Sequence, residues 1–197
     1  MNEKCRTCRK FGEKLFLKGD RCSSPKCEIV KRNYAPGAHA GARRGKRSEY
    51  SLQLQEKQKA RNEYCLREKQ FFLTFQKAAR AKEATGEMML KLLETRLDNV
   101  VYRAGWAKSR MQARQIVNHG HIKVNDKLVD IPSYQVKLKD VIEPRDAEII
   151  KNTMVEKPQL PSWLKGKQFK VEVVNTPNRE EIETSIDEQL VVEFYSR

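Results

Sequence analysis

The feature that most constrains this chain is a set of four cysteines close to its start. They follow the pattern Cys5-x2-Cys8-x13-Cys22-x4-Cys27, which is two close pairs separated by a short loop. Two such pairs can place four thiolates around one Zn²⁺ in a tetrahedron, and this leaves no open position for water. We therefore predict one structural zinc ion, without a catalytic role, that folds the N-terminal arm.

Two alternatives for these thiols remain open, a redox or iron–sulfur use and a pair of disulfides. Disulfides require an oxidising compartment, and residues 1–6 have neither the apolar stretch nor the cleavage site of a signal peptide. No apolar run approaches the roughly 18 residues that cross a bilayer. We therefore expect a cytoplasmic chain without a membrane partner. Cys65 stands apart from the four, and we assign it no role.

Positive charge is concentrated at the same end of the chain. The 197 residues carry 40 Lys and Arg against 26 Asp and Glu, a net charge of +14. Residues 1–50 hold 14 basic and 5 acidic side chains, whereas residues 151–197 hold 7 and 8. A positive excess of this size is typical of proteins that bind a polyanion, nucleic acid above all.

A turn-rich segment, residues 34–41, leads into the most basic stretch. We expect that stretch to be a loop that lies on phosphates, since neighbouring glycines let the backbone approach closely. A disordered basic linker is the alternative. The four side chains are Arg43, Arg44, Lys46 and Arg47.

Helices are predicted on both sides of residue 65. Ser48 is a favourable N-cap for a helix that runs to about residue 64. On this helix Lys57, Lys59 and Arg61 form a candidate RNA-facing side. A second helix spans about 67–82 and carries Phe71 and Phe75 at helical spacing, which indicates core packing more than base stacking. A third spans about 85–104.

Residues 93–150 indicate a compact α+β module. Ser109 and Gln112 match a capping box, and the helix that they open ends at about residue 119. A hairpin is predicted over 122–129, and alternation over 134–138 and 141–143 indicates a second strand pair.

The module also holds candidate phosphate contacts. Arg110 and Arg114 lie four residues apart near a helix N-terminus, an arrangement suited to phosphate oxygens. We expect the fold to tolerate the loss of both. Ser109, His119, His121 and Lys123 extend this polar edge, although the histidines also fit helix-stop and turn positions.

The last segment, residues 151–197, differs in character. Prolines indicate an irregular connector, and residues 169–174 and 190–195 are apolar enough for strands. Trp163 fits a core anchor better than a stacking platform. With a net charge of −1, this segment is expected to complete the body and meet protein neighbours.

Several stretches together resemble the bacterial small-subunit ribosomal protein four (uS4) family, in its four-cysteine form. The resemblance covers nearly the whole chain, with one departure, Ala40 between the motif histidine and Gly41. The stretches are Leu15–Gly19, Pro36-Gly37-x-His39, Gln55–Lys59, Leu93–Arg103, Ala113–Gln115, His119–Ile122 and Glu193–Arg197.

The resemblance implies a fold and a function. The fold would be α+β, a mostly helical body (48–92 and 151–197) with a zinc arm (1–47) and an inserted RNA-binding module (93–150) of two helices and a small sheet. The function would be that of a structural constituent of the small ribosomal subunit. It would bind the 5′ domain of 16S rRNA early and so nucleate assembly of the subunit. Residues 43–47 would line the mRNA entry channel beside small-subunit proteins three (uS3) and five (uS5). There the protein would affect translational accuracy.

Two other classes of protein share features with this chain. RNA-modifying enzymes carry a similar inserted module, but they need a separate catalytic domain, and no Gly-rich phosphate loop or acid–base pair is present here. We therefore expect no enzyme and no small-molecule substrate. A free-standing zinc regulator of nucleic acid is the other alternative, and it would not co-purify with ribosomal subunits.

Overall fold

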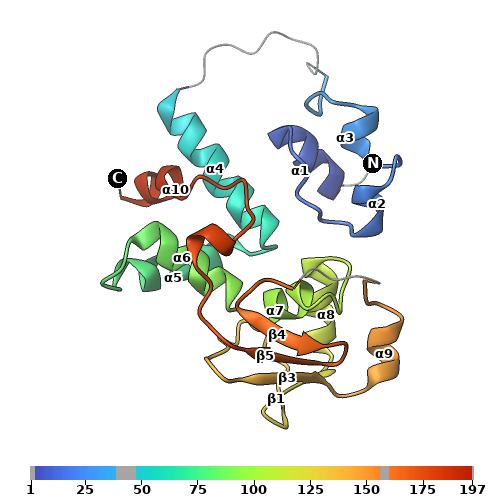
Figure 1. The fold of residues 1–197 in the computed structure, drawn as a ribbon. Coiled ribbons are helices and arrows are strands. Elements are labelled where there is room, and N and C mark those ends of the chain that lie inside the picture. Colours follow the sequence, from blue (N-terminus) through green and yellow to red (C-terminus); the bar gives the residue numbers. More distant parts are fainter. Residues whose placement is uncertain (1–2, 39–47, 156–159, 197) are drawn as a thin grey trace. The chain divides into compact units, whose positions relative to one another are not determined.

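The computed structural model describes residues 3–38, 48–155 and 160–196, which form two compact units (Figure 1). Unit 1 comprises Met1–Leu73 with Ser185–Arg197, and unit 2 comprises Thr74–Thr184. The chain therefore leaves unit 1 once and returns to it after residue 184.

Unit 1 begins with three short helices around a small core. They are α1 (Glu3–Phe11), α2 (Asp20–Ser23) and α3 (Glu28–Lys31). α1 stops at Gly12, whose φ of 80° is a left-handed conformation that glycine adopts without steric cost. The buried core is Cys8, Phe11, Leu15 and Leu17. So small a core is typical of segments that need a metal or a neighbouring element for stability.

The rest of unit 1 contains α4 (Glu49–Glu63), the start of α5 (Glu68–Ala79) and α10 (Glu188–Tyr195). Ser48 caps α4 by accepting a hydrogen bond from the Ser51 N–H, as predicted. α10 packs on α4, and the rings of Tyr50 and Phe194 are 5.8 Å apart.

The predicted strand over residues 190–195 is wrong, because these residues form α10. Asp187 supplies the reason, since its carboxylate accepts hydrogen bonds from the N–H groups of Gln189 and Leu190 and so starts a helix. Within that helix Val191 is fully buried.

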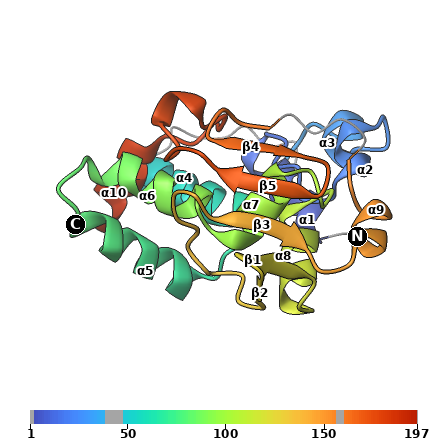
Figure 2. The ribbon, with the colours of Figure 1, turned by 60° about the horizontal axis from the view of Figure 1, so that its bottom comes forward.

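Unit 2 combines helices with one antiparallel sheet. The helices are α6 (Thr85–Glu94), α7 (Leu97–Arg103), α8 (Arg110–Asn118) and α9 (Ala147–Lys151), with a 3₁₀ turn at Arg179–Glu181. The strands are β1 (Ile122–Val124), β2 (Lys127–Leu128), β3 (Val141–Pro144), β4 (Leu164–Lys167) and β5 (Lys170–Val173). They lie in the order β2-β1-β3-β5-β4, which can be followed from bottom to top in Figure 2.

One face of the sheet and the helices α7 and α8 share a core. Along β5, Val171 and Val173 are buried while Lys170 and Glu172 are exposed, so alternate side chains enter the core. Trp106 and Trp163 are the largest side chains in this core, which confirms Trp163 as a core anchor.

The hairpin predicted over 122–129 is confirmed as β1 and β2. Asn125 and Asp126 form its turn with φ of 50° and 64°, the left-handed conformations that a two-residue hairpin turn requires.

The second predicted pair of strands is wrong, because residues 134–138 are not a strand. Their backbone bonds instead to the α6–α7 junction, where the Val136 N–H donates to Thr95 O at 2.9 Å. β3 pairs with β1 and β5.

The sheet extends beyond the module expected at residues 93–150. β4 and β5 belong to the segment 151–197, and the register Ile142↔Val171 joins them to β3. Of the segment 151–197, only Ser185–Arg197 belongs to unit 1, the helical unit. The mixture of helices with a small antiparallel sheet confirms the α+β class. Within the described ranges, no helix combines the length and the apolarity that crossing a bilayer takes.

Candidate RNA-binding surface and thiol cluster

Four cysteine side chains line one small pocket of unit 1. Cys5 and Cys8 come from α1, Cys22 from α2, and Cys27 immediately precedes α3. Cys8, Cys22 and Cys27 are buried, and all four carry free thiols. The fold thus brings together the four residues that the sequence spacing singled out.

The surroundings of the thiols suit a cation. Burial raises the pKa of the Cys8 thiol, the Leu15 N–H bonds to it and lowers the pKa, and the charges of the other three cysteines raise it. Burial also raises the pKa of Cys22, while a hydrogen bond from the Lys18 backbone lowers it. Backbone N–H groups that point at sulfur stabilise thiolates, but four thiolates in one pocket repel one another unless a cation neutralises them.

The cluster does not have the arrangement of a metal centre as it stands. Among residues 3–38, 48–155 and 160–196, no three His, Cys, Asp or Glu side chains are placed as ligands of one ion. The pocket contains four sulfur donors, which is a set that zinc accepts. For them to bind one ion, the sulfurs would have to move closer together.

Lys57 and Lys59 are buried in unit 1, contrary to the prediction of an RNA-facing side on α4. Lys57 Nζ lies 2.7 Å from Glu68 Oε1 and 4.7 Å from the centre of the Phe194 ring. Lys59 Nζ lies 2.8 Å from Glu13 Oε2 and donates to Ser185 O at 2.6 Å. Both ammonium groups are thus neutralised within the unit. Helix α4 has no distinct apolar face that could have revealed this.

Arg61, the third residue of that predicted side, is partly exposed. Its Nη1 lies 3.9 Å from Glu68 Oε2, so it belongs to the same group of charges as Lys57. Of the three cations assigned to RNA on α4, Arg61 is the one whose side chain reaches solvent.

A buried carboxylate holds two arginines at the start of α7. Arg96 donates to both oxygens of Asp98, with Nε 3.0 Å from Oδ1 and Nη2 2.9 Å from Oδ2. Arg114 of α8 donates to Oδ2 from Nη2 at 2.9 Å. The Arg114 side chain is 24% exposed, against 6% for Arg96. Asp98 therefore fixes the guanidinium plane of the more exposed arginine.

A second buried carboxylate organises Arg103 and Arg110. Arg103 binds Glu94 through both of its oxygens, at 3.0 and 2.9 Å, and Asn99 Nδ2 donates to Glu94 Oε2 at 2.8 Å. Arg110 Nε donates to Asn99 Oδ1 at 2.9 Å, and its guanidinium lies 4.8 Å from the centre of the Tyr102 ring. Arg110 is thus buried, and its contacts lie within unit 2, which argues against the expectation that the fold tolerates its loss.

The remaining predicted residues of the module lie at the two ends of α8 and at the start of the hairpin. Ser109 is buried and caps α8 by accepting from the Gln112 N–H, so the predicted cap is confirmed. His119 is exposed and closes α8, which agrees with its interpretation as a helix stop. Its ring lies 6.0 Å from that of His121, and Lys123 follows in β1. His119 and His121 are thus close together.

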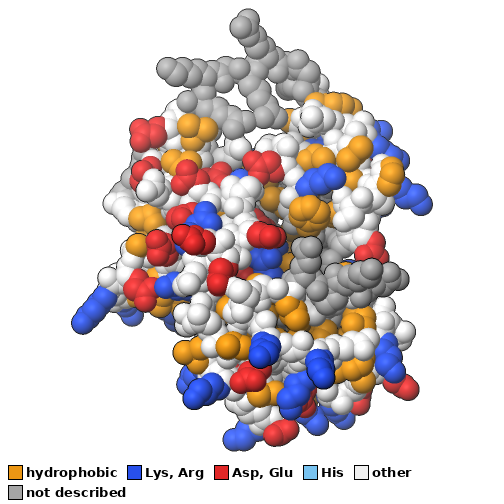
Figure 3. All heavy atoms as spheres, viewed as in Figure 1, with side chains coloured by type: hydrophobic (Ala, Val, Ile, Leu, Met, Phe, Trp, Pro, Cys, Tyr) orange, Lys and Arg blue, Asp and Glu red, His pale blue; other side chains and the backbone are white. Residues whose placement is uncertain are grey.

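Exposed lysines around the sheet are candidates that the sequence reasoning missed. The space-filling view shows Lys and Arg side chains over the part that holds the sheet (Figure 3). The available signal was the alternation in β5, where the exposed Lys170 and Glu172 alternate with the buried Val171 and Val173. The exposed lysines are Lys127, Lys137, Lys139, Lys165, Lys167 and Lys170. Arg43, Arg44, Lys46 and Arg47 lie outside the described residues.

Comparisons with known proteins settle the family. The model of the ribosomal protein S4/S9 N-terminal domain matches residues 1–94, and the S4 domain matches residues 95–142. The small ribosomal subunit protein uS4 of Natranaerobius thermophilus is 51% identical over 98% of this chain and 96% of its own length. The corresponding protein of Gloeobacter violaceus is 52% identical over the same shares. The chain belongs to the uS4 family.

The family assignment confirms two expectations from the sequence. The resemblance to uS4 is shown over nearly the full length, and a further relative, protein uS4A of Clostridium acetobutylicum, is 50% identical. The uS4 family is structural and non-enzymatic, so the chain is not an enzyme. The residues matched by the S4 domain include Asp98 and the two arginines that bind it, Arg96 and Arg114.

Proposed function

We propose that the chain is a structural constituent of the small ribosomal subunit in the cytoplasm, where it binds 16S rRNA. The observation that carries this proposal is the match to uS4 relatives over 98% of the chain. The net charge of +14 supports it, since proteins that bind rRNA must neutralise phosphates.

Co-sedimentation with ribosomal subunits tests this function. A tagged chain expressed in a uS4-depleted bacterium is expected to move with 30S particles through a sucrose gradient and to bind a transcript of the 16S 5′ domain. A chain that remains at the top of the gradient and does not bind the transcript would overturn the proposal.

The proposal extends to two roles within the subunit. The first is nucleation of assembly, in which the chain binds the 5′ domain before other proteins. The second is a place at the mRNA channel beside uS3 and uS5, where residues 43–47 contact the message and affect accuracy. Phosphate contacts are independent of sequence and exchange readily, which suits a strand that must slide. Both roles are supported by the family resemblance.

Charge neutralisation separates the two roles. Replacing Arg43, Arg44, Lys46 and Arg47 by Gln is expected to spare assembly and to slow translation of structured messages relative to unstructured ones. A control removes equal charge from exposed positions in and around α5, namely Arg67, Lys69, Lys77 and Arg80. Failed assembly of the loop variant, with equal translation rates on the subunits that do form, would show an rRNA anchor instead.

The zinc centre also belongs to this proposal. One Zn²⁺ held by Cys5, Cys8, Cys22 and Cys27 would offset half of the negative charge of the four thiolates and cross-link α1, α2 and the segment before α3. The common pocket and the N–H groups directed at Cys8 and Cys22 support it. Structural zinc contributes roughly 10–16 kcal/mol of apparent binding free energy in small modules.

Metal analysis with a matched pair of variants tests the zinc centre. Purified chain is expected to contain one zinc, Cys8→Ser to lose it together with the protease resistance of the arm, and Cys65→Ser to retain both. An arm that stays resistant in chelator, in protein that contains no zinc, would refute the metal site.

A further inference from the structure

Phe16 presents an aromatic ring to solvent from a strained backbone. Its φ is 48°, in the left-handed region that bulky side chains rarely adopt. The side chain is 47% exposed, whereas its neighbours Leu15 and Leu17 are buried in the core of the arm. The backbone conformation therefore turns the Phe16 ring away from that core.

The other exposed aromatic rings of the described residues already have partners. Tyr34 lies under Arg9, with the guanidinium carbon 4.7 Å from the ring centre. Tyr50 contacts Phe194, and Phe72 contacts Tyr195 at 5.3 Å. Among these four exposed rings, Phe16 alone has no ring or cation contact within the described part of the chain.

The loop that carries Phe16 borders the thiol cluster. Leu17 and Lys18, which directly follow Phe16, line the pocket that the four cysteines share. Two buried leucines fix the same loop from the side of the core. A strained residue persists only where its surroundings impose it, and such residues gather at ligand contacts.

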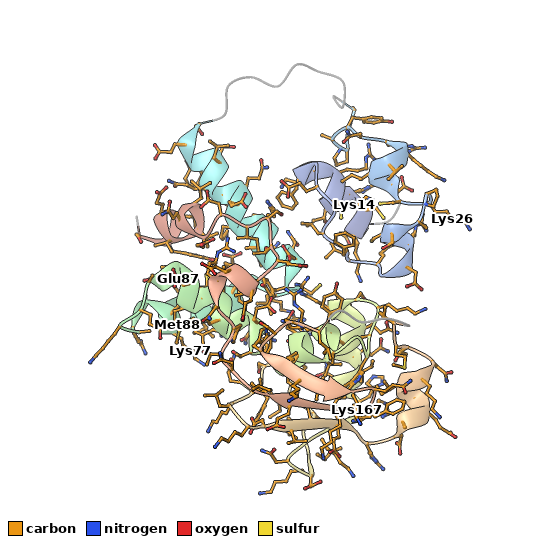
Figure 4. The ribbon with its side chains drawn as sticks, viewed as in Figure 1. Lys14, Lys26, Lys77, Glu87, Met88 and Lys167 are labelled. Carbon is orange, nitrogen blue, oxygen red and sulfur yellow. The ribbon has the colours of Figure 1, made fainter. Side chains whose placement is uncertain are left out.

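The charge around Phe16 indicates the chemistry of a partner. Residues 1–38 carry ten Lys and Arg against four Asp and Glu. Lys14 is exposed and Lys18 half-buried, two residues on either side of the ring; Lys14 and Lys26 are labelled on the arm in Figure 4. An aromatic residue flanked in the sequence by cations is a combination by which proteins bind unpaired bases, where the ring stacks and the cations meet phosphates.

We propose that Phe16 stacks on an unpaired base of the 16S rRNA that the chain binds. This inference rests on the proposed function and assigns a specific contact to it. The ring supplies stacking area, and a phenylalanine side chain has only two rotatable bonds, so that little side-chain freedom is lost on binding.

Replacing Phe16 by Gly tests the contact without breaking the loop. Glycine adopts a φ of 48° without penalty, so Phe16→Gly removes the ring and relieves the strain. The full-length variant is expected to bind a 16S 5′ domain transcript roughly 5- to 100-fold more weakly. The log–log slope of affinity against salt should stay unchanged, because stacking releases no counterions.

Two controls separate stacking from charge and from apolar area. Lys14→Gln is expected to reduce that slope by about 0.7–0.9, the share of one phosphate. Val30→Ala changes another exposed apolar side chain of the same arm and should leave affinity and slope unchanged. The variant Phe16→Trp should bind like the parent, with its additional indole emission quenched on RNA addition.

The outcomes are distinct. Parental affinity in a folded Phe16→Gly variant, or an indole emission in Phe16→Trp that RNA does not alter, would overturn the stacking contact while leaving the proposed function intact. If the unsubstituted chain does not bind the transcript, the proposed function itself fails.

Discussion

At the scale of single residues, the close approach of β4 and β5 depends on Gly166. A Cβ built at this position would overlap Lys170 O and lie 2.8 Å from Val171 Cα, and both obstacles are backbone atoms that cannot swing aside. Gly166 faces Val171 directly in the register of the two strands. The absence of a side chain therefore lets the two backbones meet.

We expect Gly166→Ala to destabilise unit 2 by about 1–3 kcal/mol, the usual cost of overpacking. Urea unfolding followed by circular dichroism measures it, and Lys165→Ala, an exposed neighbour in β4, is the control. An unchanged unfolding midpoint for the glycine variant would show that the hairpin can open without cost.

Arg110 and Arg114, a matched pair in the sequence, differ in the structure. Arg110→Ala leaves the buried Asn99 Oδ1 without its donor, whereas after Arg114→Ala the carboxylate of Asp98 still binds Arg96. An unmet buried polar group costs about 1–3 kcal/mol. We expect the Arg110 variant to be the less stable of the two in urea, and equal midpoints would contradict the network described here.

At the scale of elements, α10 is fastened to α4 and α5 by a few polar contacts. Gln53 donates to Glu193 Oε2 at 3.0 Å, and Tyr195 donates to Glu68 Oε1 at 2.9 Å. Lys57 binds the same Glu68 oxygen. Burial acts to raise the pKa of Glu68, but the hydrogen bonds from Lys57 and Tyr195 outweigh it, so the net change lowers the pKa below its usual 4.5.

The lowered pKa of Glu68 predicts acid sensitivity of this contact. A carboxyl group whose folded pKa is depressed contributes stability above its unfolded pKa and loses it as pH falls through the folded value. We expect Glu68→Gln to lower stability at pH 7 and to flatten its decline below about pH 4.5. Urea midpoints from pH 7 to pH 3 measure this, with the exposed Glu183→Gln as control. A parallel decline in both proteins would exclude Glu68 as the source.

Local signals predicted the elements that local chemistry determines. Ser48 and Ser109 capped the helices as expected, and Asn125-Asp126 formed the expected turn. Residues 190–195 were misassigned because an apolar, β-branched run fits a strand as well as a buried helix, and the deciding signal was the cap at Asp187.

The burial of the cations could not be predicted in this way. Lys59 meets Ser185 O, which is 126 residues away in the chain, and nothing near Lys59 in the sequence indicates that contact. The proximity of the four cysteines, by contrast, was predicted from their spacing in the sequence alone, and the structure places all four around one pocket. Short-range patterns identified that site, whereas the candidate RNA surface depended on long-range partners.

At the scale of the whole molecule, the net charge of +14 predicts how rRNA binding responds to salt. Each neutralised phosphate contributes roughly 0.7–0.9 to the log–log slope, so several phosphate contacts give a steep loss of affinity between 50 and 200 mM salt. Filter binding to the 16S 5′ domain over that range measures it. Equal affinity at both ends of the range would mean that phosphates do not dominate the contact.

The return of residues 185–197 to unit 1 has a consequence for how the chain matures during its synthesis. Helix α4 emerges from the ribosome early, but Ser185 O and the Phe194 ring, which partner Lys59 and Lys57, follow only after the whole of residues 74–184. Unit 2 has all of its strands before that point. The second unit along the chain can therefore fold before the first is complete, and α4 exposes two lysines without those partners until residues 185–194 have been synthesised.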